Sequence, residues 1–212
     1  MIPIPSNPPR RAWIRLPSGN RLDLINPDPQ SWTDQDLIAR ISRVYRWGGE
    51  SVHSHPLSVA QHSLTVLALR RQWSATPLTA AAALLELLHD AEEAFLGVDM
   101  ISTLKPILGK PFRDISASLS NAVADRYNLP YWQVPDHQAH KRADYVAAAT
   151  EAFHCIGWSV DEIRNVLGIS HPILTEDPLA AIYACTPWEP WTPDIAAHRF
   201  GNELATMLKL AA

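Results

Sequence analysis

Residues 81–95, with the sequence AAALLELLHDAEEAF, carry the strongest signal in this chain. Alanine and leucine dominate the first eight positions, a composition that favours a buried helix. Pro77 lies shortly before the run, and a threonine on either side of that proline could cap the first turn. His89 and Asp90 each follow a leucine by about one turn, so both would lie on a flank of the helix close to the core. The run therefore predicts one helix that carries a histidine and an aspartate inward.

Helical signals continue on both sides of this run. Thr33 has the spacing of an N-cap residue, and Gly48-Gly49 would end the helix that it starts. A second helix is expected after Pro56, with Ser58 as its cap, and runs to about Trp73. Further helices are expected at about 111–128, 136–156, 159–167 and 193–211. Because long alternating strand patterns are absent from the sequence, the fold class is predicted to be all-α, a helical bundle with irregular connections.

Residues 1–32 are predicted to form a separate segment ahead of a helical domain at residues 33–212. Four prolines occur in its first nine residues, and proline removes backbone donors and disfavours helix in the residue before it. Residues 13–16 and 21–24 flank a Pro-Ser-Gly-Asn turn and could pair as a small hairpin.

Composition limits the classes of function. The 212 residues are 47% hydrophobic and 19% charged, which suits one packed domain. A formal charge of −4 argues against stable nucleic-acid binding, because gripping a phosphate backbone needs a dense basic surface. Residues 1–11 lack the apolar stretch of a secretory signal, no run could span a membrane, and Cys155 and Cys185 form no disulfide framework. A cytoplasmic protein with a small-molecule partner is expected.

Three segments place metal-ligating side chains in helices that otherwise resemble core: Ser58-Val-Ala-Gln-His62-Ser, Leu88-His89-Asp90-Ala, and Lys141-Arg-Ala-Asp144. An ionised carboxylate at such a position is costly unless a cation compensates it. Two histidines and two aspartates on three helices therefore make a plausible site for one divalent metal ion. Manganese, cobalt, nickel, zinc, iron and magnesium all stay open.

Each of these residues has an ordinary structural alternative. A single inward histidine such as His62 is usually just hydrogen-bonded within the core, and Asp144 could pair with a basic neighbour on its own helix. Glu86, one turn before His89, could orient that histidine or lie on the solvated edge of the helix; the pattern slightly favours the solvated edge. His140 shares a face with Asp144, but nothing in the sequence calls for a second metal.

The order of His62, His89-Asp90 and Asp144 resembles the signature of the HD-domain phosphohydrolases. The likeness covers about residues 40–150. Within that range the chain is similar to the bacterial YfbR-like 5′-deoxynucleotidases, and also to the dATP triphosphohydrolases of some phages. The segments that carry this likeness are Arg46-Trp47, Ser58–Ser63, Leu88–Glu93, Gly97-Val98-Asp99 and Lys105-Pro106.

The resemblance implies a metal-dependent phosphohydrolase that acts on deoxynucleotides, either as a 5′-deoxynucleotidase or as a dNTP or dATP triphosphohydrolase. It also implies a homo-oligomer. The residues that would hold the single divalent ion are His62, His89, Asp90 and Asp144.

The remaining site residues implied by the resemblance divide between catalysis and substrate binding. Glu93 would be the acid/base residue, and Arg46 and Lys105 would contact phosphate. Trp47 would pack against the nucleoside, and Asp99 would lie near the sugar hydroxyl. Val98 stands directly before Asp99, where the family usually has glycine.

Two other functions compete with hydrolysis. One is a non-catalytic nucleotide-binding or assembly protein that retains the metal site. The other is an HD-fold di-iron oxygenase, which needs additional histidine and aspartate ligands, and the sequence shows no clear second set.

Overall fold

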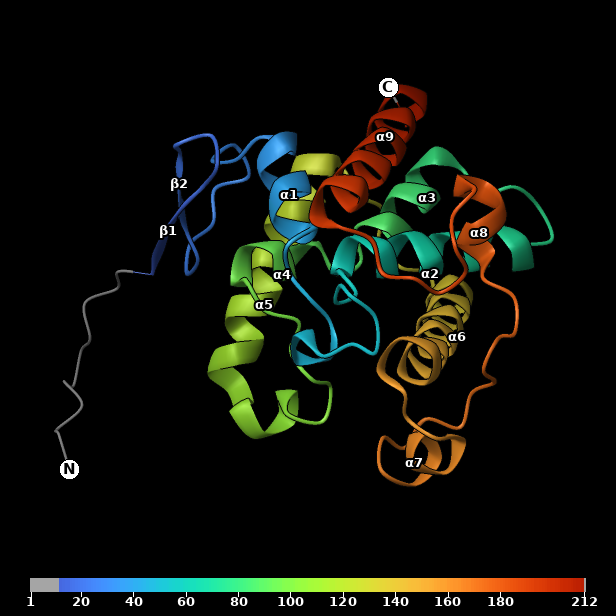
Figure 1. Cartoon of the computed structure of the whole chain (residues 1–212). Helices are drawn as coiled ribbons and strands as arrows, with labels where there is room; N and C mark the ends of the chain where they lie inside the picture. Colours follow the sequence, from blue (N-terminus) through green and yellow to red (C-terminus); the bar gives the residue numbers. More distant parts are fainter. Residues whose placement is uncertain (1–11, 212) are drawn as a thin grey trace, which may run out of the picture.

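The computed structural model describes residues 12–211 of the chain, and its architecture is helical with one small hairpin (Figure 1). The prediction of an all-α fold with a short N-terminal hairpin segment is confirmed. In chain order the elements are β1 (Trp13–Arg15), β2 (Arg21–Asp23), α1 (Asp34–Ile41), the 3₁₀ turn η1 (Trp47–Gly49), α2 (Val59–Trp73), α3 (Ala80–Leu87), α4 (Ala91–Leu96), α5 (Lys105–Tyr127), α6 (Val134–Glu151), the π-helical turn η2 (Ala152–Ile156), α7 (Val160–Asn165), α8 (Pro178–Tyr183) and α9 (Pro193–Ala211).

The hairpin forms where the sequence predicted it. Strands β1 and β2 pair antiparallel with Ile14 opposite Leu22. Leu22 is fully buried and joins the same apolar cluster as the helices, so the hairpin contributes to the core. Residues 1–11 of the predicted proline-rich segment lie outside the described residues.

Helix α2 is the central element of the fold. Its residues are buried without interruption from Val59 to Arg70, and it packs against α3, α6, α8 and α9. Ser58 caps it by accepting a hydrogen bond from the backbone N–H of Gln61, as expected. His62 lies in the first turn of α2 and is fully buried, so this histidine is placed in the interior of the molecule.

Helix α9 closes the domain on the side of α1 and α3 (Figure 1). Its apolar stripe faces the interior, so this C-terminal helix packs on its own domain. The buried residues of this stripe are Ala196, Phe200, Leu204 and Met207.

The predicted helix at residues 81–95 is wrong as a single element. Two helices, α3 and α4, take its place, and Leu88, His89 and Asp90 lie between them. Leu88 has φ −102° and ψ 13°, and Asp90 has φ −114° and ψ 23°, both outside the helical region. The physical reason is tertiary. In a continuous helix the two side chains would point about 100° apart, whereas the break lets them approach one point.

The first predicted helix also ends early, at Ile41 instead of just before Gly48. The following residues leave the helix to pair with the chain that leads into α2. The backbone N–H of Arg46 donates to the carbonyl of Leu57, and that of Val59 donates to the carbonyl of Val44. This extended pairing replaces the helical hydrogen bonds that a longer α1 would have made.

Three later elements differ from the sequence prediction. Helix α5 starts at Lys105, with a non-helical break at Gly109 (φ 73°, ψ −155°), where glycine tolerates a backbone that other residues rarely adopt. Helix α6 stops at Glu151 and continues as the π-helical turn η2. Helix α8 was not predicted, although Asp177 caps it through the N–H of Leu179.

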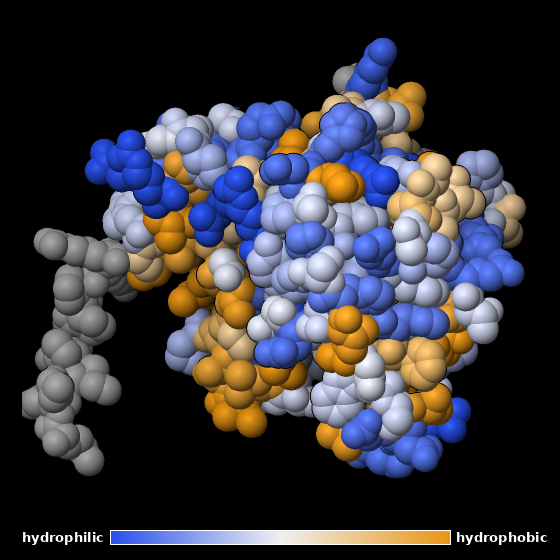
Figure 2. Space-filling model, viewed as in Figure 1, coloured by the Kyte–Doolittle hydropathy of each residue, from blue (hydrophilic) through white to orange (hydrophobic). Residues whose placement is uncertain are grey.

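Apolar side chains gather on one face over the start of α5 (Figure 2). These residues are exposed, and they lie in the connection from α4 into α5 and in the first turn of α5: Val98, Ile101, Leu104, Ile107 and Leu108. Among residues 12–211, no helix combines the length and the apolar character needed to cross a lipid bilayer.

Candidate metal centre

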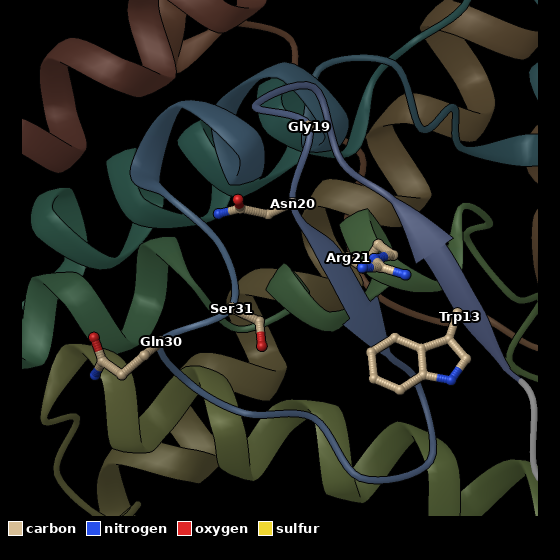
Figure 3. Close-up of a pocket in the computed structure, with 6 residues that line it drawn as sticks. All are labelled: Trp13, Gly19, Asn20, Arg21, Gln30 and Ser31. Atoms are coloured by element: carbon tan, nitrogen blue, oxygen red, sulfur yellow. The ribbon is translucent and has the colours of Figure 1, made fainter.

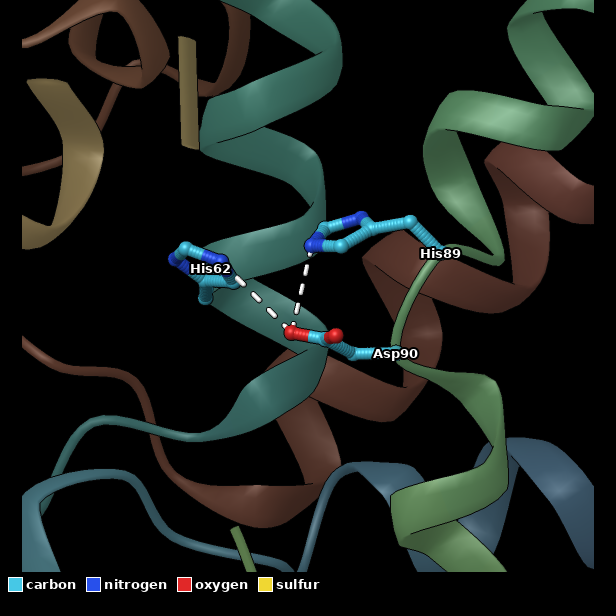
Figure 4. Close-up of side chains that lie close together, drawn as sticks. All are labelled: His62, His89 and Asp90. Atoms are coloured by element: carbon cyan, nitrogen blue, oxygen red, sulfur yellow. Dashed lines mark ion pairs between the residues drawn. The ribbon is translucent and has the colours of Figure 1, made fainter. Parts of the chain in front are cut away.

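His62, His89 and Asp90 converge at one point, and together they could hold a metal ion (Figure 4). One ligand atom from each lies within 4.8 Å of the others. Asp90 Oδ2 is 3.2 Å from His89 Nε2 and 3.8 Å from His62 Nε2. The ring centroids of the two histidines are 5.3 Å apart. The group therefore joins α2 to the break between α3 and α4.

Asp144, on α6, adds a carboxylate to this group. Its Oδ1 lies 3.3 Å from His62 Nε2, and its Oδ2 accepts from Lys141 Nζ at 3.0 Å. Both sequence interpretations of Asp144 thus describe part of its surroundings: it pairs with a lysine one turn earlier on α6, and it faces the histidine.

In His62 and His89, the contact made by Nδ1 determines which ring nitrogen carries the hydrogen. His89 Nδ1 lies 2.8 Å from the carbonyl oxygen of Glu86. A carbonyl can only accept, so Nδ1 carries the hydrogen and a neutral His89 has its lone pair on Nε2. His62 Nδ1 lies 2.7 Å from Glu151 Oε1, and donation to this carboxylate likewise leaves Nε2 with the lone pair.

Both Nε2 atoms are buried, and neither has a hydrogen-bond partner among residues 12–211. Each neutral imidazole would point a lone pair at carboxylate oxygens, an arrangement that a cation between them would convert from repulsive to attractive. Two imidazole nitrogens and two carboxylates are suitable donors for a divalent transition metal. The residues present therefore fit such an ion.

The charges around His62 also favour a cation at this position. Burial and the nearby Arg46 guanidinium oppose its protonation, but Glu151 and Asp144 outweigh them and raise the pKa of His62 to about 9. The position therefore stabilises positive charge, whether this is carried by a proton or by a metal ion.

The pKa values of the two aspartates are shifted downward, opposite to that of His62. Burial would raise the pKa of Asp90, yet the two histidines hold this pKa well below its usual range. For Asp144, burial is again outweighed, chiefly by His62, and the pKa lies well below the usual value. Both aspartates are therefore ionised over the whole physiological range.

Glu93, on α4, is buried beside the group. Its Oε1 lies 3.6 Å from Lys105 Nζ, while its Oε2 has no hydrogen-bond partner in the described part of the chain. Burial, together with the charges of Asp90 and Asp99, raises the pKa of Glu93 to about 9. Glu93 can thus carry a proton at neutral pH next to the candidate metal centre. A perturbed, buried carboxyl is typical of a catalytic acid.

Arg46 lies among three carboxylates. Its Nε donates to Glu151 Oε2 at 2.9 Å, and an outer nitrogen lies 3.8 Å from Asp99 Oδ2 and 3.9 Å from Asp90 Oδ2. The residue is only 9% exposed. The structure thus brings Arg46, Asp99 and Lys105 to the site. Their contacts with a substrate stay predictions.

Trp47 is held in an unusual backbone conformation. Its φ is 57°, and Gly48 and Gly49 follow with φ 66° and 82°. A bulky side chain at positive φ costs of the order of 1–3 kcal/mol and tends to occur at functional sites. Its ring packs on an apolar cluster at the end of α6, whose buried members are Ala149, Ala152 and Ile163.

The sequence interpretation missed the residues that support the histidines. Glu86 is 1% exposed, so the preference for a solvated helix edge is wrong. Its carboxylate accepts from Arg70 Nε at 2.5 Å and from His140 Nδ1 at 2.8 Å. The only sequence signal was a glutamate inside an apolar run. Glu151 had a similar signal, since it follows three alanines and a threonine.

Two cavities in the described residues lie away from this centre. One, of about 810 Å³, opens beside the hairpin and is lined by Trp13, Gly19, Asn20, Arg21, Gln30 and Ser31 (Figure 3). The other, of about 380 Å³, lies beside α7 and is lined by residues between Val160 and Ile173. Neither cavity is lined by a candidate site residue.

Comparison with known proteins finds a relative that is similar over most of the chain. No family model matches the chain. An uncharacterized protein of Rhodobacter capsulatus is 38% identical to it over 167 residues, which cover 78% of this chain and 84% of the relative. Identity at this level over most of both chains shows common descent. This chain belongs to the same protein family as the Rhodobacter capsulatus protein.

Proposed function

We propose that this protein is a metal-dependent phosphohydrolase that releases phosphate from deoxynucleotides. The observation that carries the proposal is the pair of buried Nε2 atoms on His62 and His89, which have no hydrogen-bond partner in residues 12–211 and face ionised Asp90 and Asp144. Beside them, Lys105 offers a positive charge for phosphate binding, and Glu93 offers a carboxyl that can hold a proton.

Four residues would hold the ion: His62, His89, Asp90 and Asp144. When bound, a divalent ion supplies Lewis acidity toward phosphoryl oxygens and makes water nucleophilic at neutral pH. Mixed nitrogen and oxygen donors suit manganese, iron, cobalt, nickel or zinc better than magnesium, which prefers oxygen ligands.

Glu93 would handle the proton. Since its carboxyl is protonated at neutral pH, it can donate from Oε2 to the oxygen that leaves with the nucleoside. Lys105 Nζ, 3.6 Å from Glu93 Oε1 and 40% exposed, can meet a phosphate that enters from solvent. The outer nitrogens of Arg46 offer the paired donors that suit phosphate oxygens.

The substrate class rests on the resemblance of residues 40–150 to the YfbR-like 5′-deoxynucleotidases. In this proposal Asp99 lies close to the sugar and Trp47 close to the nucleoside. The contact of Asp99 with Arg46 supports this arrangement, because it places a potential sugar-binding acid next to a potential phosphate-binding base.

The test is a phosphate-release panel over deoxy- and ribonucleotides, mono- and triphosphates, with each divalent metal in turn. We expect phosphate release that stops with a chelator and disappears in His62→Ala and Asp90→Ala, because each variant lacks a side chain that would hold the ion. The exposed His198 on α9 provides a matched histidine control, and His198→Ala should keep full activity. No release from any deoxynucleotide by metal-loaded protein would overturn the substrate class.

The same measurements distinguish the competing functions. Tight deoxynucleotide binding without turnover would favour a nucleotide-binding or assembly protein. An iron content of about two per chain would favour a di-iron oxygenase, whose site needs more ligands than one ion does. Homo-oligomer formation stays a prediction, and sedimentation analysis measures it.

A further inference from the structure

Glu151 is a buried carboxylate to which the proposed reaction assigns no part. It is the last residue of α6, and it is 3% exposed. Its two oxygens have different partners: Oε1 lies 2.7 Å from His62 Nδ1, and Oε2 accepts from Arg46 Nε at 2.9 Å. These partners are 89 and 105 residues away in sequence. One carboxylate thus joins α2, α6 and the loop that contains Arg46.

The contact with His62 determines which nitrogen is free. Because Oε1 of Glu151 accepts the Nδ1 hydrogen, the lone pair of His62 is on Nε2, the atom that faces Asp90 and Asp144. A carboxylate on the far nitrogen also fixes the ring orientation and increases its strength as a ligand.

The contact with Arg46 fixes a second group. Holding Nε leaves an outer nitrogen of the guanidinium directed at Asp99 and Asp90. The loop after Arg46 is attached to η2, the turn that directly follows Glu151, because the N–H of Val52 donates to the carbonyl of Cys155 at 2.8 Å. Arg46 therefore approaches the centre from a direction that Glu151 determines.

We propose that Glu151 is a positioning residue that couples the metal ligand His62 to Arg46. Its single carboxylate sets the imidazole tautomer on one side and the guanidinium orientation on the other. The metal part follows from the contacts around His62 alone, whereas the part concerning phosphate rests on the proposed function.

Glu151→Gln tests this coupling. Glutamine has the same size, but its one acceptor oxygen can serve only one of the two N–H donors, and its amide group faces the other. We expect the affinity for Zn²⁺ or Mn²⁺, measured by calorimetry, to fall by about 10- to 100-fold. Thr150→Val is the matched control, because it removes buried hydrogen bonds from the neighbouring residue without touching His62 or Arg46. An affinity in Glu151→Gln equal to that of the wild type would overturn the proposal.

A spectroscopic measurement on the wild type decides the matter even if the variant does not fold. In the Zn²⁺-loaded protein with ¹⁵N-labelled histidine, the NMR spectrum should show His62 with a proton on Nδ1 and none on Nε2. If Nδ1 of His62 carries no proton, Glu151 does not position it and the inference fails.

The phosphate side is measured with inorganic phosphate. Metal-saturated Glu151→Gln should bind it about tenfold or more weakly than Thr150→Val does, since a misdirected guanidinium loses a charge-assisted hydrogen bond. Equal phosphate affinity would remove Arg46 from the coupling.

These outcomes separate this inference from the proposed function. A wild type that hydrolyses no nucleotide but loses metal affinity in Glu151→Gln would retain the role of Glu151 toward His62 and refute the phosphohydrolase. If the wild type hydrolyses nucleotides and Glu151→Gln binds metal as tightly as the wild type, the phosphohydrolase is supported and the role of Glu151 is refuted.

Discussion

His62 shows how single residues set the chemistry of this protein. It is a fully buried imidazole, with Glu151 on one nitrogen and Asp90 and Asp144 on the side of the other. Removing one partner of a buried charged pair costs about 3–5 kcal/mol, because the other charge stays in the core without compensation. Substitutions of these acids therefore need a stability measurement beside every assay of function.

Glu93 gives a prediction at this scale. Glu93→Gln keeps the shape of the side chain but removes its ability to transfer a proton. We expect kcat to fall by about 10²- to 10⁴-fold, the usual contribution of general acid–base catalysis. Metal affinity should not change, because Glu93 is not one of the four residues proposed to hold the ion, which are His62, His89, Asp90 and Asp144.

The neighbouring Glu92 supplies the control for that variant. It is also buried, at 8% exposure, so Glu92→Gln tests the effect of neutralising a glutamate on α4 without touching the proposed proton donor. A steady-state assay in which Glu93→Gln retains the activity of Glu92→Gln would exclude Glu93 as the acid.

At the scale of the elements, the contacts of α1 and α9 stabilise the helices around the site. The carboxylate of Asp36 on α1 accepts from the N–H of Ser18 at 2.7 Å and from that of Thr33 at 2.8 Å. It thus caps its own helix and ties the hairpin turn to it. On the other side, α9 covers α1 and α3 with buried apolar residues.

The contacts of Asp36 predict how the stability of the junction between α1 and the hairpin turn depends on pH. Burial opposes its ionisation, but the N–H groups of Thr33 and Ser18 outweigh burial and hold the pKa of Asp36 below its usual value. A carboxyl with a lowered folded-state pKa stabilises the fold fully above its unfolded-state pKa of about 3.9, and this contribution is lost as pH falls through the folded-state pKa.

Asp36→Asn should therefore lower the free energy of unfolding by about 1.5–3 kcal/mol at pH 7. The difference from the wild type should shrink as pH falls from about 4 toward 2, because the wild-type carboxyl is then protonated too. Urea denaturation at several pH values measures this, and a difference that stays constant down to pH 2 would contradict the assignment.

Phe200 tests the closure by α9. Its side chain is fully buried, so Phe200→Ala should destabilise the protein by about 3–5 kcal/mol through lost burial and a residual cavity. Leu210, on the same helix but 68% exposed, is the control, and Leu210→Ala should change stability by no more than about 0.5 kcal/mol. Equal effects of the two substitutions in urea denaturation would show that α9 does not seal the core.

For the whole molecule, the candidate metal centre brings together distant parts of the chain. Its ligands come from α2, from the break between α3 and α4, and from α6. An ion bound by all of them would connect these elements in the folded state alone, since the unfolded chain does not hold them together. Metal binding at this centre would therefore raise the stability of the whole fold.

This linkage predicts a rise in thermal stability on metal addition. At a free metal concentration 100 times Kd, the gain is about 2.7 kcal/mol, which corresponds to roughly 5–10 °C in Tm for a domain of this size. His62→Ala and Asp90→Ala should lose the shift, and His198→Ala should retain it. A wild-type melting temperature that no divalent metal changes would argue against a metal site.

Much of this arrangement could be predicted from the sequence because it depends on local patterns. The hairpin followed from two short apolar segments around a Pro-Ser-Gly-Asn turn, and the start of α2 followed from the cap Ser58. Glu86 and the two-helix form of residues 81–95 could not be predicted in the same way. A glutamate in an apolar run can be exposed to solvent or buried. Glu86 is buried because Arg70 and His140, which belong to other helices, donate hydrogen bonds to its carboxylate.

The sequence by itself determined the helical class and the side chains available for chemistry, since periodicity and capping act over a few residues. Only the tertiary structure decided where His89 and Asp90 point, and that Glu151 faces both His62 and Arg46. Those contacts join positions as far as 105 residues apart. They arise because packing α6 against α2 buries polar groups beside one another, and a buried charge is costly unless it has a partner.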